Sequence, residues 1–137
     1  MIKVHIFHTG SVQVDDSIPH GSKNPFAVTG LFRGKDGPVG KSYDVFGDGS
    51  ILLVNTPGHS HGLFTAIIKN TERYIALAGD AIYTGKSIRE KLIPGFTVDK
   101  TLAHKSLTWI CELSEDENCL GVFANHDPEI KEQIIEL

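Results

Sequence analysis

The segment Ser50-Ile-Leu-Leu-Val-Asn-Thr-Pro-Gly-His59 joins an apolar run to a tight turn and then to a histidine. The same order occurs twice more: Tyr74-Ile-Ala-Leu-Ala-Gly-Asp80 ends on an aspartate, and Leu120-Gly-Val-Phe-Ala-Asn-His126 ends on a second histidine. Short apolar runs bounded by turn-forming residues are typical of buried strands. If these strands are neighbours with a common edge, their tips bring together two imidazoles and a carboxylate, which are ligand types that zinc accepts. The pattern therefore predicts a metal site formed by His59, Asp80 and His126.

Each of these three residues also has an ordinary structural interpretation. A histidine after Pro-Gly can be a loop residue satisfied by hydrogen bonds, Asp80 can cap the turn that follows it, and His126 can pack under the start of a helix. Gly58 and Gly79 stand beside two of the candidates and allow the backbone to turn or approach closely, as a small site requires. From the residues alone, both interpretations stay open.

The remaining segments predict an α/β fold with one domain over residues 1–137. Strands that are apolar on both faces are usually covered on both sides, so we expect a sandwiched sheet. Asp99 is suited to cap a helix, because its carboxylate can accept a hydrogen bond from a free backbone N–H. The expected elements are an N-terminal hairpin (2–8 and 12–14), a second hairpin (43–46 and 50–55), strands at 63–69, 74–78 and 120–124, a helix over 99–113, and a short C-terminal helix beginning at Asp127-Pro128.

Composition argues against several classes of partner. The formal net charge is -4, and the Lys and Arg residues are scattered, so no basic surface is expected for nucleic acid or anionic lipid. The opening Met1 to His8 lacks the apolar core of a signal peptide, and no apolar run approaches the roughly 20 residues of a membrane helix. The two cysteines, Cys111 and Cys119, are expected to be buried thiols. A cytoplasmic protein with no membrane partner is the expectation.

Four motifs resemble one known family. They are Thr56-Pro-Gly-His59, Ala78-Gly-Asp-Ala-Ile-Tyr83, Asn125-His-Asp127 and the opening Val4-His-Ile-Phe-His-Thr-Gly10. Together they resemble the metallo-beta-lactamase superfamily, and within it the branch of N-acyl-homoserine lactonases, which hydrolyse the lactone ring of bacterial quorum signals. The resemblance covers nearly the whole chain apart from the glycine-rich stretch 30–40.

The resemblance implies a paired-zinc site in a four-layer αββα sandwich. In that arrangement a hydroxide between the metals attacks the carbonyl of a small lactone or ester, and one metal polarises the carbonyl oxygen. His59 would serve one metal, His126 the other, and Asp80 would bridge both. Tyr83 would hydrogen-bond the substrate carbonyl or the developing oxyanion. The alternative for Tyr83 is a half-buried aromatic residue on the loop after a strand.

One departure from the family changes the expected function. The family's His-x-His-x-Asp-His motif supplies four further ligands, and no stretch between Met1 and Asn55 has that spacing. His61 could replace a lost ligand, or it could be an exposed loop residue. We therefore expect a truncated sandwich with a deletion junction near 30–40, and an uncovered apolar face that favours a homo-oligomer.

Two functions remain open on this evidence. The first is a lactonase-like hydrolase that binds zinc or another divalent transition metal, substoichiometrically or with a second chain lending ligands, and that is impaired or inactive as this chain alone. The second is a non-catalytic metal-binding or interaction remnant of such an enzyme.

Overall fold

The computed structural model describes residues 1–6, 34 and 36–137. In chain order the elements are β1 (Lys3–Ile6), β2 (Ser42–Asp44), β3 (Ile51–Asn55), β4 (Phe64–Lys69), β5 (Tyr74–Gly79), α1 (Gly85–Glu90), α2 (Lys100–Glu115), β6 (Cys119–Ala124) and β7 (Gln133–Glu136). The second strand of the predicted N-terminal hairpin and part of the predicted deletion junction (30–33 and 35) lie outside the described residues, as do His8 and His20.

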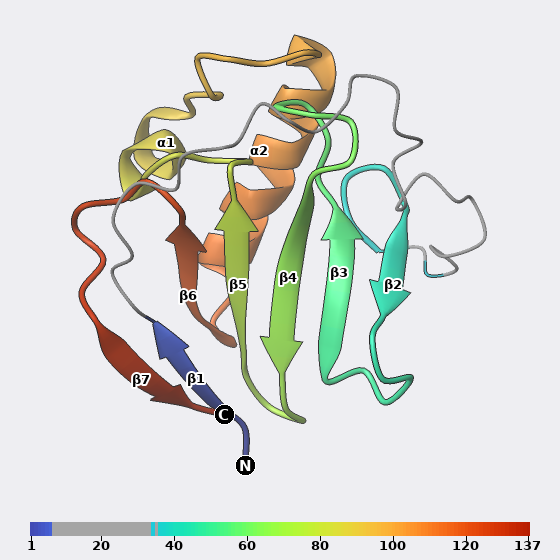
Figure 1. Cartoon of the computed structure of the whole chain (residues 1–137), viewed down its shortest axis with the longest axis vertical. Coiled ribbons are helices and arrows are strands. Elements are labelled where there is room, and N and C mark those ends of the chain that lie inside the picture. Colours follow the sequence, from blue (N-terminus) through green and yellow to red (C-terminus); the bar gives the residue numbers. More distant parts are fainter. Residues whose placement is uncertain (7–33, 35) are drawn as a thin grey trace, which may run out of the picture.

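A five-stranded sheet with the order β2-β3-β4-β5-β6 forms the centre of the molecule (Figure 1). The first four strands pair antiparallel, and β5 pairs with β6 in parallel. The predicted hairpin 43–46 and 50–55 is confirmed as β2–β3, and the strands predicted at 63–69, 74–78 and 120–124 are confirmed as β4, β5 and β6. Because β3, β5 and β6 all run in one direction, their C-terminal ends meet at the same edge of the sheet.

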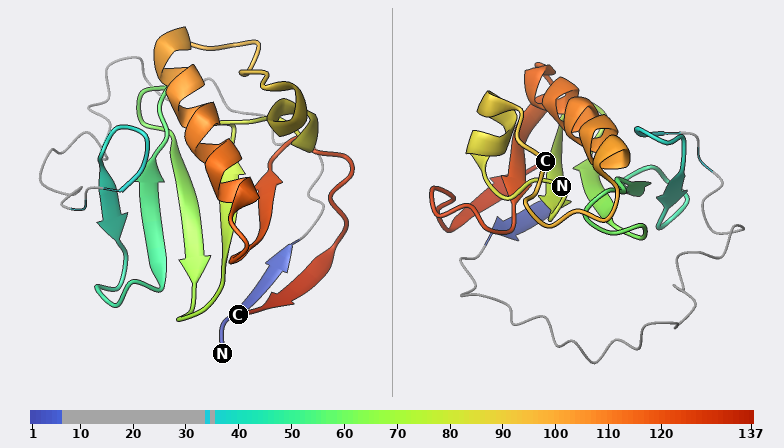
Figure 2. Two further views of the ribbon diagram at one scale, coloured as in Figure 1. Left: turned by 180° about the vertical axis from the view of Figure 1, so that it is seen from behind. Right: turned by 90° about the horizontal axis from the view of Figure 1, so that it is seen from above.

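Both helices lie on one face of this sheet (Figure 2). The apolar side of α2 buries Leu107, Ile110 and Cys111 against Ala78 and Ala124 of the central strands. The predicted helix is confirmed, and so is its cap: the Asp99 side chain accepts a hydrogen bond from the backbone N–H of Leu102 at 2.9 Å. A core of this kind stabilises the fold through the apolar area that it removes from water.

The opposite face of the sheet carries no helix in the part of the chain that the structure describes (Figure 2). In register across it stand Leu53, Ala66 and Leu77, which are half-buried. The expectation of a sheet covered on both sides is confirmed for the face that carries the two helices. The described residues thus form one mixed sheet with one helical layer.

The C-terminal prediction was wrong. No helix begins at Asp127: its backbone carbonyl accepts a hydrogen bond from Ile130, which closes a single turn, and its carboxylate accepts from the N–H groups of Glu129 and Gly85. The chain then extends into β7, which pairs antiparallel with β1. Pairing with β1 satisfies the backbone groups that a helix would have satisfied internally.

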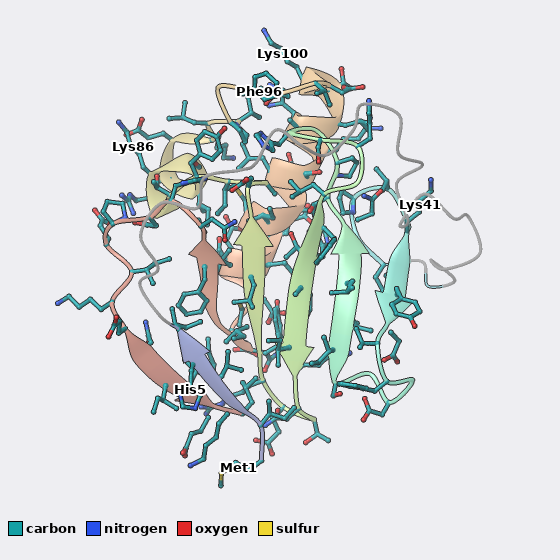
Figure 3. All side chains as sticks on the ribbon, viewed as in Figure 1. Met1, His5, Lys41, Lys86, Phe96 and Lys100 are labelled. Carbon is teal, nitrogen blue, oxygen red and sulfur yellow. The ribbon has the colours of Figure 1, made fainter. Side chains whose placement is uncertain are left out.

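None of the helices within the described ranges is long and apolar enough to cross a membrane. The chain ends β1 and β7 form a separate two-stranded ribbon, fastened by an ion pair of 3.0 Å between Lys3 and Glu136. Met1 and His5 lie at this end of the molecule, whereas Phe96 and Lys100 lie at the opposite end, beyond the C-terminal tips of the parallel strands (Figure 3).

Candidate functional site

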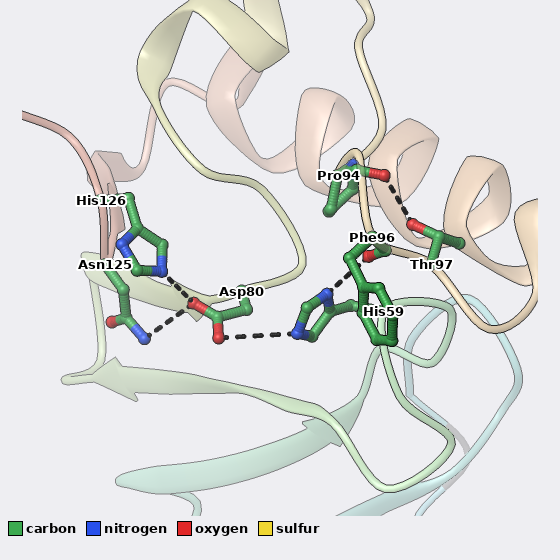
Figure 4. A network of polar contacts seen from close by, with 7 residues as sticks. All are labelled: His59, Asp80, Pro94, Phe96, Thr97, Asn125 and His126. Carbon is green, nitrogen blue, oxygen red and sulfur yellow. Dashed lines mark hydrogen bonds and ion pairs between the residues drawn. The ribbon is translucent and has the colours of Figure 1, made fainter. Parts of the chain in front are cut away.

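The structure brings the three candidate ligands together at the C-terminal edge of the sheet. Asp80 follows β5 and lies between the two histidines, which follow β3 and β6 (Figure 4). The Nε2 atom of His126 lies 3.1 Å from Asp80 Oδ1, and the Nε2 atom of His59 lies 3.8 Å from Asp80 Oδ2. Each carboxylate oxygen thus faces a different imidazole.

Two glycines allow this approach. Gly79 ends β5 with a φ of +55°, a left-handed conformation that glycine adopts without steric cost, and it turns the chain immediately before Asp80. Gly58 has a φ of +142°, and a Cβ atom built there would lie 2.3 Å from the Cα atom of Ala103 in α2. The prediction that these glycines allow a turn or a close approach is confirmed as a turn at Gly79 and a close approach at Gly58. The close approach at Gly58 seats the loop that carries His59 directly on the helix.

A loop between the two helices fixes the orientation of His59. The Nδ1 atom of His59 lies 2.7 Å from the carbonyl oxygen of Phe96. Since a carbonyl can only accept, Nδ1 carries the proton, and in the neutral ring Nε2 is left with a lone pair directed at Asp80. The same loop is held because Val98 and Asp99 donate backbone N–H groups to the carbonyl of Gly58 at 2.9 and 3.1 Å.

Asn125 is a further member of the site that sequence reasoning missed. Its Nδ2 atom donates to Asp80 Oδ1 at 3.2 Å (Figure 4). The only sequence signal for it is its place next to His126. The Phe96 carbonyl left no signal at all, because a backbone group can be supplied by any residue type.

Tyr83 lies beside both histidines, as its position in the motif predicts. Its ring centroid is 5.2 Å from that of His126 and 6.0 Å from that of His59, with edge-to-face geometry in both pairs. The residue is half-buried, so its ring forms part of the wall of the site. His61, in contrast, is an exposed loop residue, and the polar network around Asp80 does not include it (Figure 4).

The imidazole and carboxylate groups are of the types that bind divalent metals, but they face one another only two at a time. Among the described residues, no group of three or more His, Cys, Asp or Glu side chains is placed to hold a metal ion. The 3.8 Å between His59 Nε2 and Asp80 Oδ2 is too long for a hydrogen bond. It is near the separation of about 3.4 Å expected between two ligands of one tetrahedral zinc. Further ligands would have to come from water or from another source.

No family model matches this chain. It is 31% identical over 88 residues to the N-acyl homoserine lactonase AttM of Rhizobium radiobacter, which covers 64% of this chain and 33% of that protein. It is 33% identical over 90 residues to AttM of Rhizobium johnstonii, which covers 63% of this chain and 33% of that protein. The chain thus spans about a third of the length of these relatives.

Solved structures of lactonases share the fold. An N-acyl homoserine lactone hydrolase with the product N-hexanoyl-L-homoserine at its catalytic metal centre superposes with a TM-score of 0.54 and 29% identity, over 64% of this chain and 34% of that one. A quorum-quenching N-acyl homoserine lactone lactonase superposes with a TM-score of 0.53 and 30% identity, over 64% of this chain and 35% of that one.

The described fold is a partial metallo-beta-lactamase-like α/β fold. Within that class the chain is similar to the N-acyl homoserine lactonases, over about two thirds of its own length. The resemblance to this superfamily and to its lactonase-like branch is therefore confirmed, but over 64% of the chain, which is less than the nearly complete coverage predicted from the sequence.

Proposed function

We propose that this chain is a lactonase-like, metal-dependent hydrolase of lactones or related esters whose site is incomplete in a single chain. The observation that carries the proposal is the carboxylate of Asp80, which presents one oxygen to His59 and the other to His126. The similarity to lactonases supports it, since one of them holds a ring-opened product at a catalytic metal centre.

The proposed roles are those that the resemblance to the lactonases implies, and the arrangement of the side chains supports them. His59 and Asp80 are the residues that would hold a metal, with His126 on the other side of the carboxylate. A divalent metal bound there supplies Lewis-acid polarisation of a substrate carbonyl. Tyr83, whose ring lies edge-to-face with both imidazoles, would donate a hydrogen bond from its hydroxyl to the substrate carbonyl oxygen and stabilise the negative charge that develops on it.

The site needs more ligands than the described residues provide. A catalytic zinc usually has three protein ligands and an open position for water, whereas here the donors are available only in pairs. We therefore expect weak turnover from the isolated chain, and a gain when a second polypeptide lends ligands. A homo-oligomer is one source of such ligands.

The cytoplasmic location also stays a prediction.

The same shortage of ligands favours a second candidate function. Without a third ligand, the pair can bind a metal weakly and catalyse nothing, as expected of a non-catalytic metal-binding or interaction remnant. Metal binding without any turnover would support this alternative.

The proposal is tested by assaying the ring opening of N-hexanoyl-homoserine lactone. The chain is first equilibrated with zinc, cobalt or manganese, and the reaction is then monitored through the protons that it releases. We expect slow turnover above the buffer rate that is lost in His59→Ala and Asp80→Asn and kept in His61→Ala. His61 is a suitable control because it is an exposed histidine of the same loop. Turnover that survives in His59→Ala would mean that another site or a contaminant is responsible.

A further inference from the structure

Two segments meet beside the site, and each carries one of its residues. One is the turn after β5, which carries Tyr83 and leads into α1, and the other is the tip of β6, which leads into His126. The carboxylate of Asp127, the next residue, accepts a hydrogen bond from the backbone N–H of Gly85 at 2.6 Å. We infer that Asp127 is a positioning residue, whose bond to Gly85 holds the ring of Tyr83 against His126. This inference rests on the proposed function, in which Tyr83 contacts the substrate.

The bond supplies an acceptor that α1 lacks in its own sequence. The first N–H groups of an α-helix have no partner within the helix, and a side chain at the N-cap position commonly accepts from one of them. In α1 the N-cap residue is Thr84, whose side chain makes no such bond, and the first turn contains no acidic residue. Asp127 accepts from Gly85, the first residue of the helix, across 42 residues of sequence.

The carboxylate of Asp127 is fixed on both sides. While Oδ2 accepts from Gly85, Oδ1 accepts from the backbone N–H of Glu129 at 2.9 Å, and the side chain is half-buried. An ion pair between Arg89 and Glu129 joins the same two segments, but its atoms lie 3.9 Å apart and both side chains are more than half exposed, so it contributes little. The main polar connection between α1 and the tip of β6 is therefore the Asp127 carboxylate.

Tyr83 lies between two anchors. Ala81 and Ile82, directly before it, are buried in the core beneath α2. On its other side, α1 begins two residues later and is bonded to Asp127. The ring of Tyr83 lies 5.2 Å from that of His126, so this contact crosses between the same two segments as the bond. Loss of the bond removes only the second anchor, so Tyr83 should move while the core stays folded.

The nuclear Overhauser effect (NOE) between the ring protons of Tyr83 and His126 measures this contact in the metal-free full chain, without turnover. We expect the NOE in the parent protein. It should be lost in Asp127→Ala and kept in Asp127→Asn, because an amide oxygen also accepts a hydrogen bond from the N–H of Gly85.

Gly85→Pro breaks the same bond from the donor side. Proline has no N–H and suits the first position of a helix. The residue before a proline must be extended, and Thr84 already is, with φ of -150° and ψ of 167°. This variant should lose the NOE as Asp127→Ala does, and it decides the question if Asp127→Ala does not fold.

Asp44 provides a matched control. Its two carboxylate oxygens also accept from two backbone N–H groups, those of Gly47 and Gly49, at 2.9 and 2.8 Å. It lies before the start of β3, whereas His59 follows the end of that strand. Asp44→Ala should therefore keep the NOE although it loses the same number of hydrogen bonds. Backbone amide spectra of each variant would show that the fold is kept.

Turnover of a lactone gives a second readout. A small displacement of a group that contacts the substrate costs rate, so kcat should fall about 10-fold in Asp127→Ala and Gly85→Pro, with a smaller change in KM, and Asp127→Asn should restore most of it. Asp44→Ala should keep the parent kcat.

The outcomes separate this inference from the proposed function. An NOE of parent strength in Asp127→Ala or Gly85→Pro, or a parent kcat in both, would overturn the role of Asp127 and leave the proposed function standing. Loss of the NOE in Asp44→Ala as well would also overturn that role, because Tyr83 would then respond to any loss of stability. No turnover in the parent would overturn the proposed function, and with it the part of Asp127 in a reaction.

Discussion

The ring of His59 is fastened by its Nδ1 atom to the carbonyl of Phe96, 37 residues further along the chain, at 2.7 Å. Because this contact crosses from the end of β3 to the loop before α2, the orientation of the histidine depends on tertiary structure. Histidines that bind metals are commonly fixed by a hydrogen bond of this kind on the nitrogen that does not bind.

The first prediction concerns the tautomer of His59. In metal-free protein at alkaline pH, the neutral ring should carry its proton on Nδ1, since the Phe96 carbonyl can only accept. The ¹⁵N shifts of the ring nitrogens measure this, with the exposed His104 of α2 as an internal reference. A proton found on Nε2 of His59 would contradict the described geometry.

The second prediction concerns Gly58. The change Gly58→Ala places a Cβ atom 2.3 Å from the backbone of Ala103 and demands a strained φ, so we expect a loss of stability above about 3 kcal/mol. Urea unfolding measures the loss. Gly47→Ala is the control: it has a φ of +76° but nothing within 4 Å, and only the backbone strain of about 1 kcal/mol should remain. Equal losses in the two variants would show that the contact with α2 is unimportant.

The third prediction concerns the cap of α2. Asp99→Ala removes the acceptor for the Leu102 N–H and should lower the free energy of unfolding by about 1 kcal/mol. Asp99→Asn should restore most of it, because an asparagine side chain also caps helices. A loss in the asparagine variant as large as that in the alanine variant would point to charge, and away from the hydrogen bond, as the cause.

The fourth prediction concerns the two thiols. Burial raises the pKa of both Cys111 and Cys119, so the reactive thiolate is scarcer than in an exposed cysteine. Reaction with a disulfide reagent at neutral pH should be slow in the folded chain and should accelerate in denaturant. Raising the pH should speed the folded-state reaction only above the pH range in which a free thiol ionises. Fast labelling of the native chain would show that one of the thiols is accessible and reactive.

The sequence predicts the features that depend on residues close together in the chain, and it does not predict those that depend on residues far apart in the chain. The strands at β3, β5 and β6 and their common edge follow from three local patterns of apolar run, turn and polar residue, and Asp99 is a local capping signal. These features were predicted correctly.

Features that depend on distant partners were missed. β7 forms because Gln133–Glu136 meets Lys3–Ile6 at the other end of the chain, and no local pattern indicates that pairing. The sequence at Asp127 is typical of the start of a helix, yet its carboxylate accepts a hydrogen bond from the N–H of Gly85, 42 residues away. Asn125 and the Phe96 carbonyl were missed for the same reason.

The most direct test of the central claim is the zinc content of the purified chain after equilibration and removal of free metal, measured beside His59→Ala and the control His61→Ala. We predict about one equivalent or less in the parent, the same in His61→Ala, and a loss to background in His59→Ala. Zinc absent from the parent, or unchanged in His59→Ala, would contradict the claim that His59 and Asp80 form a metal-binding pair.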